Sequence, residues 1–358
     1  MKEIPKTHKH RTRIKDIAVL ANVSVGTVDR VLHDRGEVSE KTRKQVLKII
    51  RDLNYEPDIL ASALASKKTY HIATLIPESN KESRFWDSPL KGLNRASEEI
   101  KHFDFNLNNF FFDQNSKKSF GEQSSKILET RPDGVIVVPF FSELAGIFCT
   151  ELDKRKIPYI LMNSSLPTPN GLGFVGQNAY HSGRVAAKLM TYGIQDPFSV
   201  LIVNFTRENG NTNHILEREK GFRSYISESM KNKVEIVSLN ISEFENNKVG
   251  KILSEYNYLF NSNHGVFVTS SRVFKVAGYI SKIQQGNPRL IGYDLLDENK
   301  TYLLDDTIDF LISQKPEEQG YKSLLALYNH LIFRKFIDKE YFVPIDIITK
   351  ENILYYNN

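Results

Sequence analysis

The sequence predicts an α/β protein with an all-α helix-turn-helix headpiece and a hinge helix, followed by two doubly wound parallel-sheet subdomains. Residues 13–65 show helical periodicity, with a tight turn between two short helices. Beyond residue 69, short continuous apolar segments alternate with amphipathic helical patterns, which is typical of parallel sheets covered on both faces. The length of 358 residues exceeds that of a typical single domain, so two or three units are expected.

The first two helices have the spacing of a helix-turn-helix unit. Residues 15–21 place apolar side chains at helical intervals, and Asn22-Val23 supplies a turn. Ser24 is a good N-cap, because its hydroxyl can accept a hydrogen bond from an amide of the next helix. In such units the second helix enters the major groove of DNA. Its inward positions are Val28, Val31 and Leu32.

A third, longer and basic helix should begin after a second N-cap, Ser39. It is expected to bury Val46, Ile49, Ile50 and Leu53. After it, Pro57 suits a first helical turn, and the residues that follow are mostly good helix formers. The segment is too short to be stable alone, so residues 58–68 are interpreted as a hinge helix, with a plain linker as the alternative.

The excess positive charge is confined to the N-terminal part. Residues 1–70 hold 15 Lys and Arg against 9 Asp and Glu, whereas the remainder holds 33 against 34. Positive charge that coincides with a helix-turn-helix pattern favours contact with DNA phosphates over a merely solvated tail.

The remainder of the chain contains two blocks of strands and helices, at about residues 70–163 and 172–293, completed by C-terminal elements. Strands are predicted at residues 71–77, 134–138, 158–162, 174–175, 198–204, 265–269, 289–293, 308–312 and 345–348. Helical patterns separate them, for example at residues 182–191, 217–228 and 273–282, and a further helix is predicted from Pro316. Ligands of doubly wound folds bind beyond the carboxyl ends of the strands. Aromatic rings there can cover the apolar faces of a sugar, while amides, Arg and Asp can bind its hydroxyls. These ends carry the candidate side chains Phe85, Trp86, Asn163, Asn178, Ser271, Arg272, Asp294 and Gln314. For Phe85 and Trp86 a core position is the alternative, and for Asp294 a simple turn position.

The N-terminal stretch resembles the lactose-repressor/galactose-repressor family of bacterial transcription regulators over about 50 ungapped residues. The resemblance is carried by Asp16-Ile17-Ala18, Val23-Ser24, Thr27-Val28, Arg30-Val31-Leu32, Val38-Ser39, Lys41-Thr42-Arg43, Leu53-Asn54-Tyr55, Pro57 and Leu64-Ala65. Members of this family join the headpiece to a domain like the periplasmic binding proteins. The implied division is a headpiece at 12–57, a hinge at 58–68 and an effector-binding and dimerisation domain at 69–358. Its subdomains are predicted at 70–163 with 295–325, and at 164–294 with 326–358.

The resemblance implies a DNA-binding surface on the headpiece. Val25 and Gly26 occupy the pair of positions with which the family selects operator bases, and Leu64 matches the side chain that wedges into the minor groove. Three partners stay open for Asp29: Arg30, Arg13, or a cytosine amino group. Tyr55 is either a groove contact or a core aromatic. The complete predicted set is Ser24, Val25, Gly26, Thr27, Arg30, Ser39, Thr42, Tyr55 and Leu64.

The resemblance also sharpens the ligand site. Arg218 begins a motif that resembles the family's R-x-x-G-[FW], whose Arg points into the cleft; a surface position is the alternative. Gly292-Tyr293-Asp294 resembles a motif whose Asp accepts sugar hydroxyls. The sequence departs from the family at Gln177-Asn178-Ala179 and at Ser270, which leaves the identity of the ligand open.

These inferences predict a DNA-binding transcriptional regulator, most simply a repressor, whose affinity for its operator is controlled by a small carbohydrate. Its partners would be a pseudo-palindromic double-stranded operator, the effector and a second copy of the chain. A non-sugar metabolite and a sugar-binding transport protein are the alternatives. The sequence has no nucleophile elbow, HExxH motif or nucleotide-binding glycine motif, and a single Cys149, so no catalytic site, metal site or cofactor is expected. No run approaches the length of a membrane span and no secretory signal is present, so a cytoplasmic protein is expected.

Overall fold

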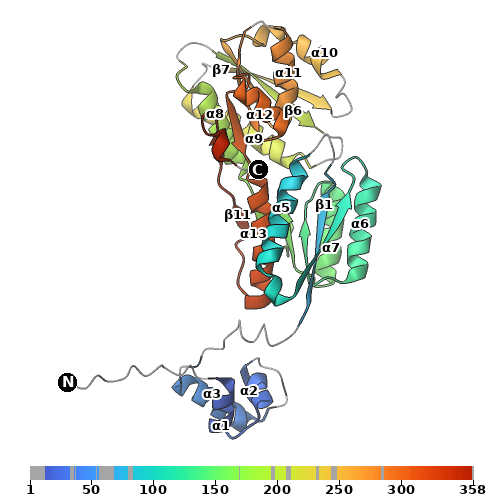
Figure 1. The fold of residues 1–358 in the computed structure, drawn as a ribbon, viewed down its shortest axis with the longest axis vertical. Coiled ribbons are helices and arrows are strands. Elements are labelled where there is room, and N and C mark those ends of the chain that lie inside the picture. The colour runs from blue at the N-terminus through green and yellow to red at the C-terminus, as the bar shows by residue number, and fades with distance from the viewer. Residues whose placement is uncertain are drawn as a thin grey trace, which may run out of the picture. The chain divides into compact units, whose positions relative to one another are not determined.

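The computed structural model describes residues 13–32, 36, 38–53, 55, 68–79, 84–168, 170–194, 198–206, 211–230, 234–242, 248–283 and 286–356. The chain divides into two compact units, Met1–Lys67 and Lys68–Asn358 (Figure 1). Apart from Lys68, the predicted hinge lies outside the described residues, and so does Leu64. Each unit is treated separately below.

The first unit, the headpiece, contains three helices around a small apolar core. They are α1 (Ile14–Leu20), α2 (Val25–Leu32) and α3 (Glu40–Asp52). The core consists of Ile17, Ala18, Ala21, Val28, Val31 and Val46, with Leu32, Ile49 and Ile50 packed against it. The turn between α1 and α2 uses Asn22 at φ 51°, a left-handed conformation that Asn tolerates better than most residues.

Both predicted N-caps are confirmed. The Ser24 hydroxyl accepts a hydrogen bond from the amide of Thr27 at 3.1 Å, and the Ser39 hydroxyl accepts one from the amide of Thr42 at 3.2 Å. The predicted burial of Leu53 is wrong, because the residue is the C-cap of α3 and its side chain is 38% exposed. The predicted pattern of core residues is therefore correct through Ile50 and fails at Leu53, which lies beyond the last residue of the helix.

The second unit contains two six-stranded sheets. The first sheet has the strand order β11-β5-β4-β3-β1-β2. Its strands, all parallel to their neighbours, are β1 (Tyr70–Pro77), β2 (Phe105–Phe112), β3 (Gly134–Val137), β4 (Tyr159–Met162), β5 (Gly173–Gly176) and β11 (Glu340–Phe342). The second sheet has the order β12-β10-β9-β8-β6-β7. Its strands are β6 (Phe198–Thr206), β7 (Val234–Ser242), β8 (His264–Val268), β9 (Arg289–Tyr293), β10 (Phe310–Ser313) and the antiparallel β12 (Asp346–Ile348).

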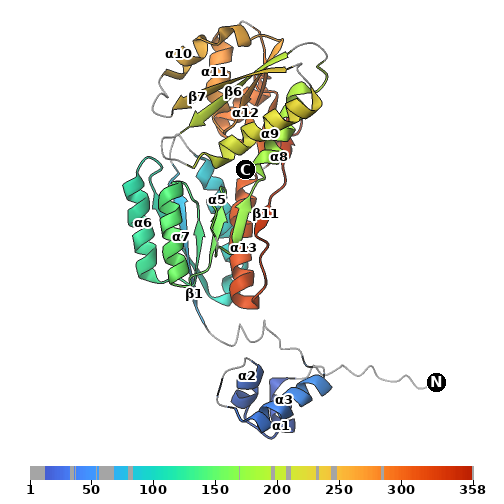
Figure 2. The same cartoon turned by 180° about the vertical axis from the view of Figure 1, so that it is seen from behind.

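Helices cover both faces of each sheet (Figures 1 and 2). The first sheet is covered by α5 (Asp87–Glu99) and α13 (Pro316–Phe333) on one face and by α6 (Lys117–Thr130) and α7 (Ser142–Lys154) on the other. The second sheet is covered by α8 (Ala179–Thr191) and α9 (Asn213–Ser229) on one face. Its other face is covered by α10 (Val249–Ser254), α11 (Val273–Ile283) and α12 (Asp297–Leu304). Short 3-10 turns complete the chain at Arg84–Trp86, Lys101–Phe103, Asn257–Leu259 and Ile353–Tyr355.

The two sheets share one topology, and the chain crosses between them three times. It crosses from β5 into α8, from β10 into α13, and from β11 into β12. The predicted subdomain boundaries are therefore wrong in three places: β5 and β11 belong to the first sheet, and β10 belongs to the second. A continuous apolar segment indicates that a strand is present, but it does not indicate to which of the two sheets that strand belongs.

The close contact between α8 and α9 depends on two glycines. A Cβ on Gly221 of α9 would lie 1.9 Å from the carbonyl oxygen of Tyr180 in α8, and one on Gly183 would lie 1.9 Å from that of Arg218. The two helices therefore pack backbone to backbone. This packing fixes the position of Arg218, the residue that the fold brings to the cleft.

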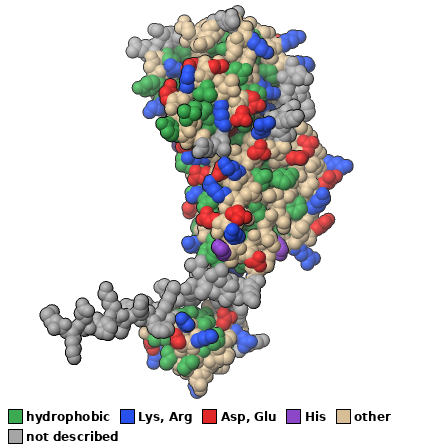
Figure 3. Space-filling model, in the orientation of Figure 1, with side chains coloured by type: hydrophobic (Ala, Val, Ile, Leu, Met, Phe, Trp, Pro, Cys, Tyr) green, Lys and Arg blue, Asp and Glu red, His purple; other side chains and the backbone are tan. Residues whose placement is uncertain are grey.

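Cys149 is buried in the core under α7, where burial raises the pKa of its thiol to about 12. Over the face shown in Figure 3, Lys and Arg side chains are interspersed with Asp and Glu. Within the described part of the chain, no helix combines the length and apolar character needed to cross a bilayer.

Candidate functional site

The start of α2 forms an exposed surface on the headpiece. Ser24, Val25, Gly26 and Arg30 are exposed, and the Val25 side chain is 40% accessible. A Cβ on Gly26 would meet only the Ser24 hydroxyl, at 3.8 Å, so no protein atom fills the space beside this backbone. The structure thus places the predicted base-reading residues on one solvent-facing patch.

The remaining predicted DNA contacts also have structural roles. The hydroxyls of Thr27 and Thr42 lie 2.9 Å and 2.8 Å from those of the capping residues Ser24 and Ser39. Tyr55 is partly buried against the headpiece core, and its amide donates to the carbonyl of Ile50 at 2.9 Å. The core alternative for Tyr55 is therefore supported, and its contact with DNA remains a prediction.

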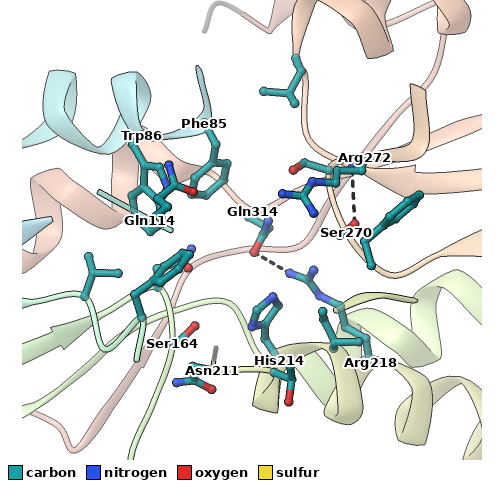
Figure 4. Close-up of a pocket in the computed structure, with 18 of the residues that line it drawn as sticks. Phe85, Trp86, Gln114, Ser164, Asn211, His214, Arg218, Ser270, Arg272 and Gln314 are labelled. Atoms are coloured by element: carbon teal, nitrogen blue, oxygen red, sulfur yellow. Dashed lines mark hydrogen bonds between the residues drawn. The ribbon is translucent and has the colours of Figure 1, made fainter. Parts of the chain in front are cut away.

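The second unit has a cavity of about 150 Å³ between its two subdomains, at the carboxyl ends of the strands (Figure 4). The position agrees with the rule for ligand sites in doubly wound folds. The described lining residues are Phe85, Trp86, Gln114, Val138, Phe140, Asn163, Ser164, Phe205, Asn211, Thr212, His214, Ile215, Arg218, Ser270, Ser271, Arg272, Phe274, Leu296 and Gln314. Seven predicted effector-binding residues are among them: Phe85, Trp86, Asn163, Arg218, Ser271, Arg272 and Gln314.

One wall of the cavity is aromatic. Phe85 and Trp86 lie edge to face, with ring centroids 5.0 Å apart, in the turn that follows β1. Phe140, after β3, lines the cavity, whereas its neighbour Phe141 is 5% exposed and belongs to the core. Flat apolar rings beside polar groups suit a ligand that has both apolar faces and hydroxyls.

Arg218 is the central polar residue of the opposite wall. Its side chain is 2% exposed and projects from α9. One terminal nitrogen donates to the carbonyl of Thr269 at 2.7 Å, the other donates to Oε1 of Gln314 at 2.5 Å, and the guanidinium lies 3.7 Å from the centroid of the Tyr293 ring. Burial lowers the pKa of this guanidinium. The surface alternative for Arg218 is therefore wrong.

Asp294 lies behind Gln314 and does not line the cavity. Its carboxylate accepts hydrogen bonds from the Gln314 amide nitrogen at 3.3 Å and from Gln314 Nε2 at 2.5 Å. Burial raises the pKa of Asp294 to about 6, against the opposing effect of Arg218. The expected direct contact between this side chain and a ligand is thus replaced by a relay in which Asp294 orients Gln314, and Gln314 accepts from Arg218.

Asn178 is also outside the cavity lining. Its side chain caps α8 by accepting from the amide of His181 at 2.9 Å. In contrast, Asn163 lines the cavity and donates from Nδ2 to Oε1 of Gln319 at 3.3 Å. Asn178 therefore acts as the N-cap of α8, a role that explains a polar residue just before a helix.

The buried Asn299 holds the loops of the second subdomain together. Its Nδ2 donates to the carbonyls of Ser271, Tyr293 and Asp294 at 2.9 to 3.0 Å, and its Oδ1 accepts from the amide of Phe274. The Asn299 side chain thereby fixes the turn after β8, which carries Ser271 and Arg272, and also the turn after β9. Sequence reasoning missed this residue because a polar position inside a helix gives no sign of burial.

Several cavity residues also escaped the sequence analysis. Gln114 follows β2, a strand that was not predicted, and Asn211, Thr212 and His214 lie at the start of α9, which begins four residues before the predicted helix. Helical spacing could have identified His214, because it lies one turn before Arg218 in α9 and therefore on the same face of the helix.

The fold and the site together define a class of protein: a helix-turn-helix unit joined to a two-subdomain small-molecule-binding unit. The family model of the periplasmic binding protein domain matches residues 72–335, and that of the bacterial regulatory proteins of the lacI family matches residues 13–58. The chain belongs to the lacI family of bacterial regulatory proteins, with an effector unit of the periplasmic-binding-protein type. The transport-protein alternative accounts for the match to the periplasmic binding protein domain but not for the match to the lacI family.

Similar proteins include both sequences and solved structures. The transcriptional regulator RegA of Clostridium acetobutylicum is 32% identical over 151 residues, which are 42% of this chain and 43% of RegA. The sucrose operon repressor of Streptococcus mutans is 24% identical over 95% of this chain and 99% of its own. A crystal structure of a LacI-type transcriptional regulator from Bacteroides fragilis is 32% identical, with a TM-score of 0.73, over 81% of this chain and all of that one. The first curated relatives are matched over less than half of their length.

Proposed function

We propose that this protein is a DNA-binding transcriptional regulator whose affinity for its operator is set by a carbohydrate bound between the two subdomains. The observation that carries the proposal is the cavity, in which aromatic rings from one subdomain face Arg218 and Gln314. A helix-turn-helix headpiece in the same chain supplies the DNA-binding output. The sucrose operon repressor, named for a sugar, supports the class of effector.

The protein would act in the cytoplasm as a homodimer on a pseudo-palindromic operator, because two half-sites require two recognition helices. The cavity is lined by both subdomains, so a ligand that contacts both stabilises one arrangement of them. A coupling of about 1–3 kcal/mol between the two sites would change operator affinity about 5- to 150-fold. No catalytic step is part of this proposal.

Selection of binding sequences from a random double-stranded DNA library tests the DNA-binding half. The full chain should enrich a pseudo-palindrome, and Arg30→Ala should abolish that preference. Arg51→Ala is the matched control, because Arg51 is an exposed arginine at the end of α3, away from α2. Enrichment of the same sequence by the Arg30 variant would remove Arg30 from the reading surface, and enrichment of no sequence by the wild type would overturn the proposal.

A thermal-shift screen tests the effector half. A ligand present at about 100 times its dissociation constant stabilises the protein by about 2.7 kcal/mol, which shifts the melting temperature measurably. The panel contains monosaccharides, sugar acids, sugar phosphates and purines. A carbohydrate that shifts the melt and also changes binding to the selected DNA is the expected result, whereas a response to purines alone would contradict the carbohydrate assignment.

A further inference from the structure

The described cavity lining is cationic. It contains two arginines and one histidine, Arg218, Arg272 and His214, but no Asp or Glu. Arg218 is buried, and a buried charge is costly unless an opposite charge or several hydrogen bonds accompany it. The lining therefore favours a ligand that brings negative charge with it.

Two nitrogen atoms at this site lack a partner. The Nε of Arg218 and the Nδ1 of His214 are buried, and neither has a hydrogen-bond partner among the described residues. Both side chains project from α9 toward the cavity (Figure 4). Burial, with the neighbouring Arg218, lowers the pKa of His214 to about 3, so the imidazole is neutral near pH 7. Unsatisfied buried polar atoms are rare, and a bound ligand is one way to satisfy them.

The carboxylate of Asp294 does not place negative charge on the wall of the cavity. It is 3% exposed, and both of its oxygens accept from Gln314. It is therefore not available as an acceptor for ligand hydroxyls. Arg272 projects from the turn after β8 and points its guanidinium into the cavity, toward Phe85 (Figure 4).

The volume of the cavity is enough for one ring. A cavity of about 150 Å³ can hold a single six-membered ring such as benzene. The cavity of about 150 Å³ seen here can therefore hold one sugar ring.

We propose that the effector is an acidic monosaccharide whose anionic oxygens bind Arg272 and the unpartnered nitrogens of Arg218 and His214, while its ring packs against the aromatic wall. This inference rests on the proposed function and narrows it. The anionic group is a carboxylate in a sugar acid or a phosphate in a sugar phosphate, and both present oxygens that match a guanidinium.

Binding of matched sets of sugars to the full chain tests the proposal. Each set contains one neutral hexose, its uronic acid and its 6-phosphate: glucose, glucuronate and glucose 6-phosphate, and the galactose, mannose and fructose equivalents, measured by isothermal titration calorimetry. The acidic member of one set should bind at least about tenfold more tightly than the neutral one, because a charged hydrogen bond is worth about 10- to 100-fold in affinity. The uronate and phosphate arms separate the two sources of the anion.

Variants then assign the charge to a residue. Arg272→Gln should weaken the acidic ligand about 10- to 100-fold and weaken the neutral analogue much less. The matched control Arg184→Gln removes an arginine on α8 that pairs with Glu228 outside the cavity, and it should change neither affinity. A circular dichroism melt of both variants checks that they are folded.

The possible results separate this inference from the proposed function. If a neutral sugar binds as tightly as its acid, or if Arg272→Gln weakens both equally, the acidic assignment is overturned while a carbohydrate effector stands. If no carbohydrate in any set binds, both the acidic assignment and the carbohydrate effector are overturned. Weakening of the acidic ligand alone at higher ionic strength would add support, because salt screens charge pairing.

Discussion

The buried carboxyl of Asp294 should make the stability of the second unit depend on pH. The perturbation that reveals this is Asp294→Asn, which keeps the shape of the side chain but cannot ionise. Asn is the appropriate replacement because residue 294 has φ 66°, a conformation that Asn tolerates and that would strain Ala by about 1–2 kcal/mol. The change also alters one hydrogen bond to Gln314, and this effect is the same at every pH near neutrality.

The magnitude follows from the pKa, which burial raises from 3.8 to about 6. Between these values the folded protein keeps a proton on Asp294 that the unfolded chain has released, so the free energy of unfolding falls as pH rises. Below pH 3.8 the carboxyl is neutral in both states, and above about pH 6 the loss is complete. The total loss is roughly 3 kcal/mol, and the Asn variant should not show it.

Urea denaturation followed by tryptophan fluorescence measures this effect. Trp86 is the single tryptophan of the chain and is 6% exposed, so its emission reports on the second unit. Between pH 4 and pH 7 the stability of Asp294→Asn should rise by roughly 2 kcal/mol relative to the wild type, which is most of the total. Asp338→Asn, at an exposed position, is the control and should run parallel to the wild type. Parallel curves for Asp294→Asn as well would refute the reasoning.

Three further substitutions test the packing described above. Gly26→Ala should stabilise the headpiece by about 1 kcal/mol, because an exposed helical glycine with open space around it is replaced by the best helix former; calorimetry of the headpiece transition measures it. Gly221→Ala should destabilise the second unit by about 3 kcal/mol, since its Cβ would meet the Tyr180 carbonyl oxygen at 1.9 Å, and an unchanged urea midpoint would contradict this. Asn299→Leu should cost at least about 3 kcal/mol, because three buried carbonyls lose their donor; a smaller loss in the same assay would mean that water replaces the side chain.

Short-range patterns explain which parts of the fold the sequence could predict. Continuous apolar segments identified the central strands β1, β3, β4, β6, β8 and β9, because these strands are buried on both faces. The strands β2, β7 and β11 were missed. All three are edge strands. In β2 only the two end residues, Phe105 and Phe112, are buried, and most residues of β7 are exposed or partly exposed. An edge strand needs less apolar surface, so its pattern is weaker.

The ligand site was predictable where the reasoning depended on the ends of strands and, for Arg218, on the family's R-x-x-G-[FW] motif. Phe85, Asn163, Arg272 and Gln314 line the cavity because every parallel strand ends at the same edge of its sheet. Asp294 also follows a strand, but its side chain lies behind Gln314. Its depth depends on contacts between segments twenty residues apart, which no local pattern records.

The cavity and the crossings between subdomains share residues, and this gives the proposed coupling a physical route. Gln314 lies at the crossing from β10 into α13, and its backbone carbonyl accepts from Gln319 Nε2 at 2.8 Å. At the crossing from β5 into α8, Gln177 donates to the carbonyl of Ser313 at 2.9 Å. The side chain of Gln314 meanwhile accepts from Arg218 inside the cavity. We therefore propose that a ligand that rearranges Arg218 also acts on the segments about which the two subdomains would rotate, which would couple binding to subdomain closure.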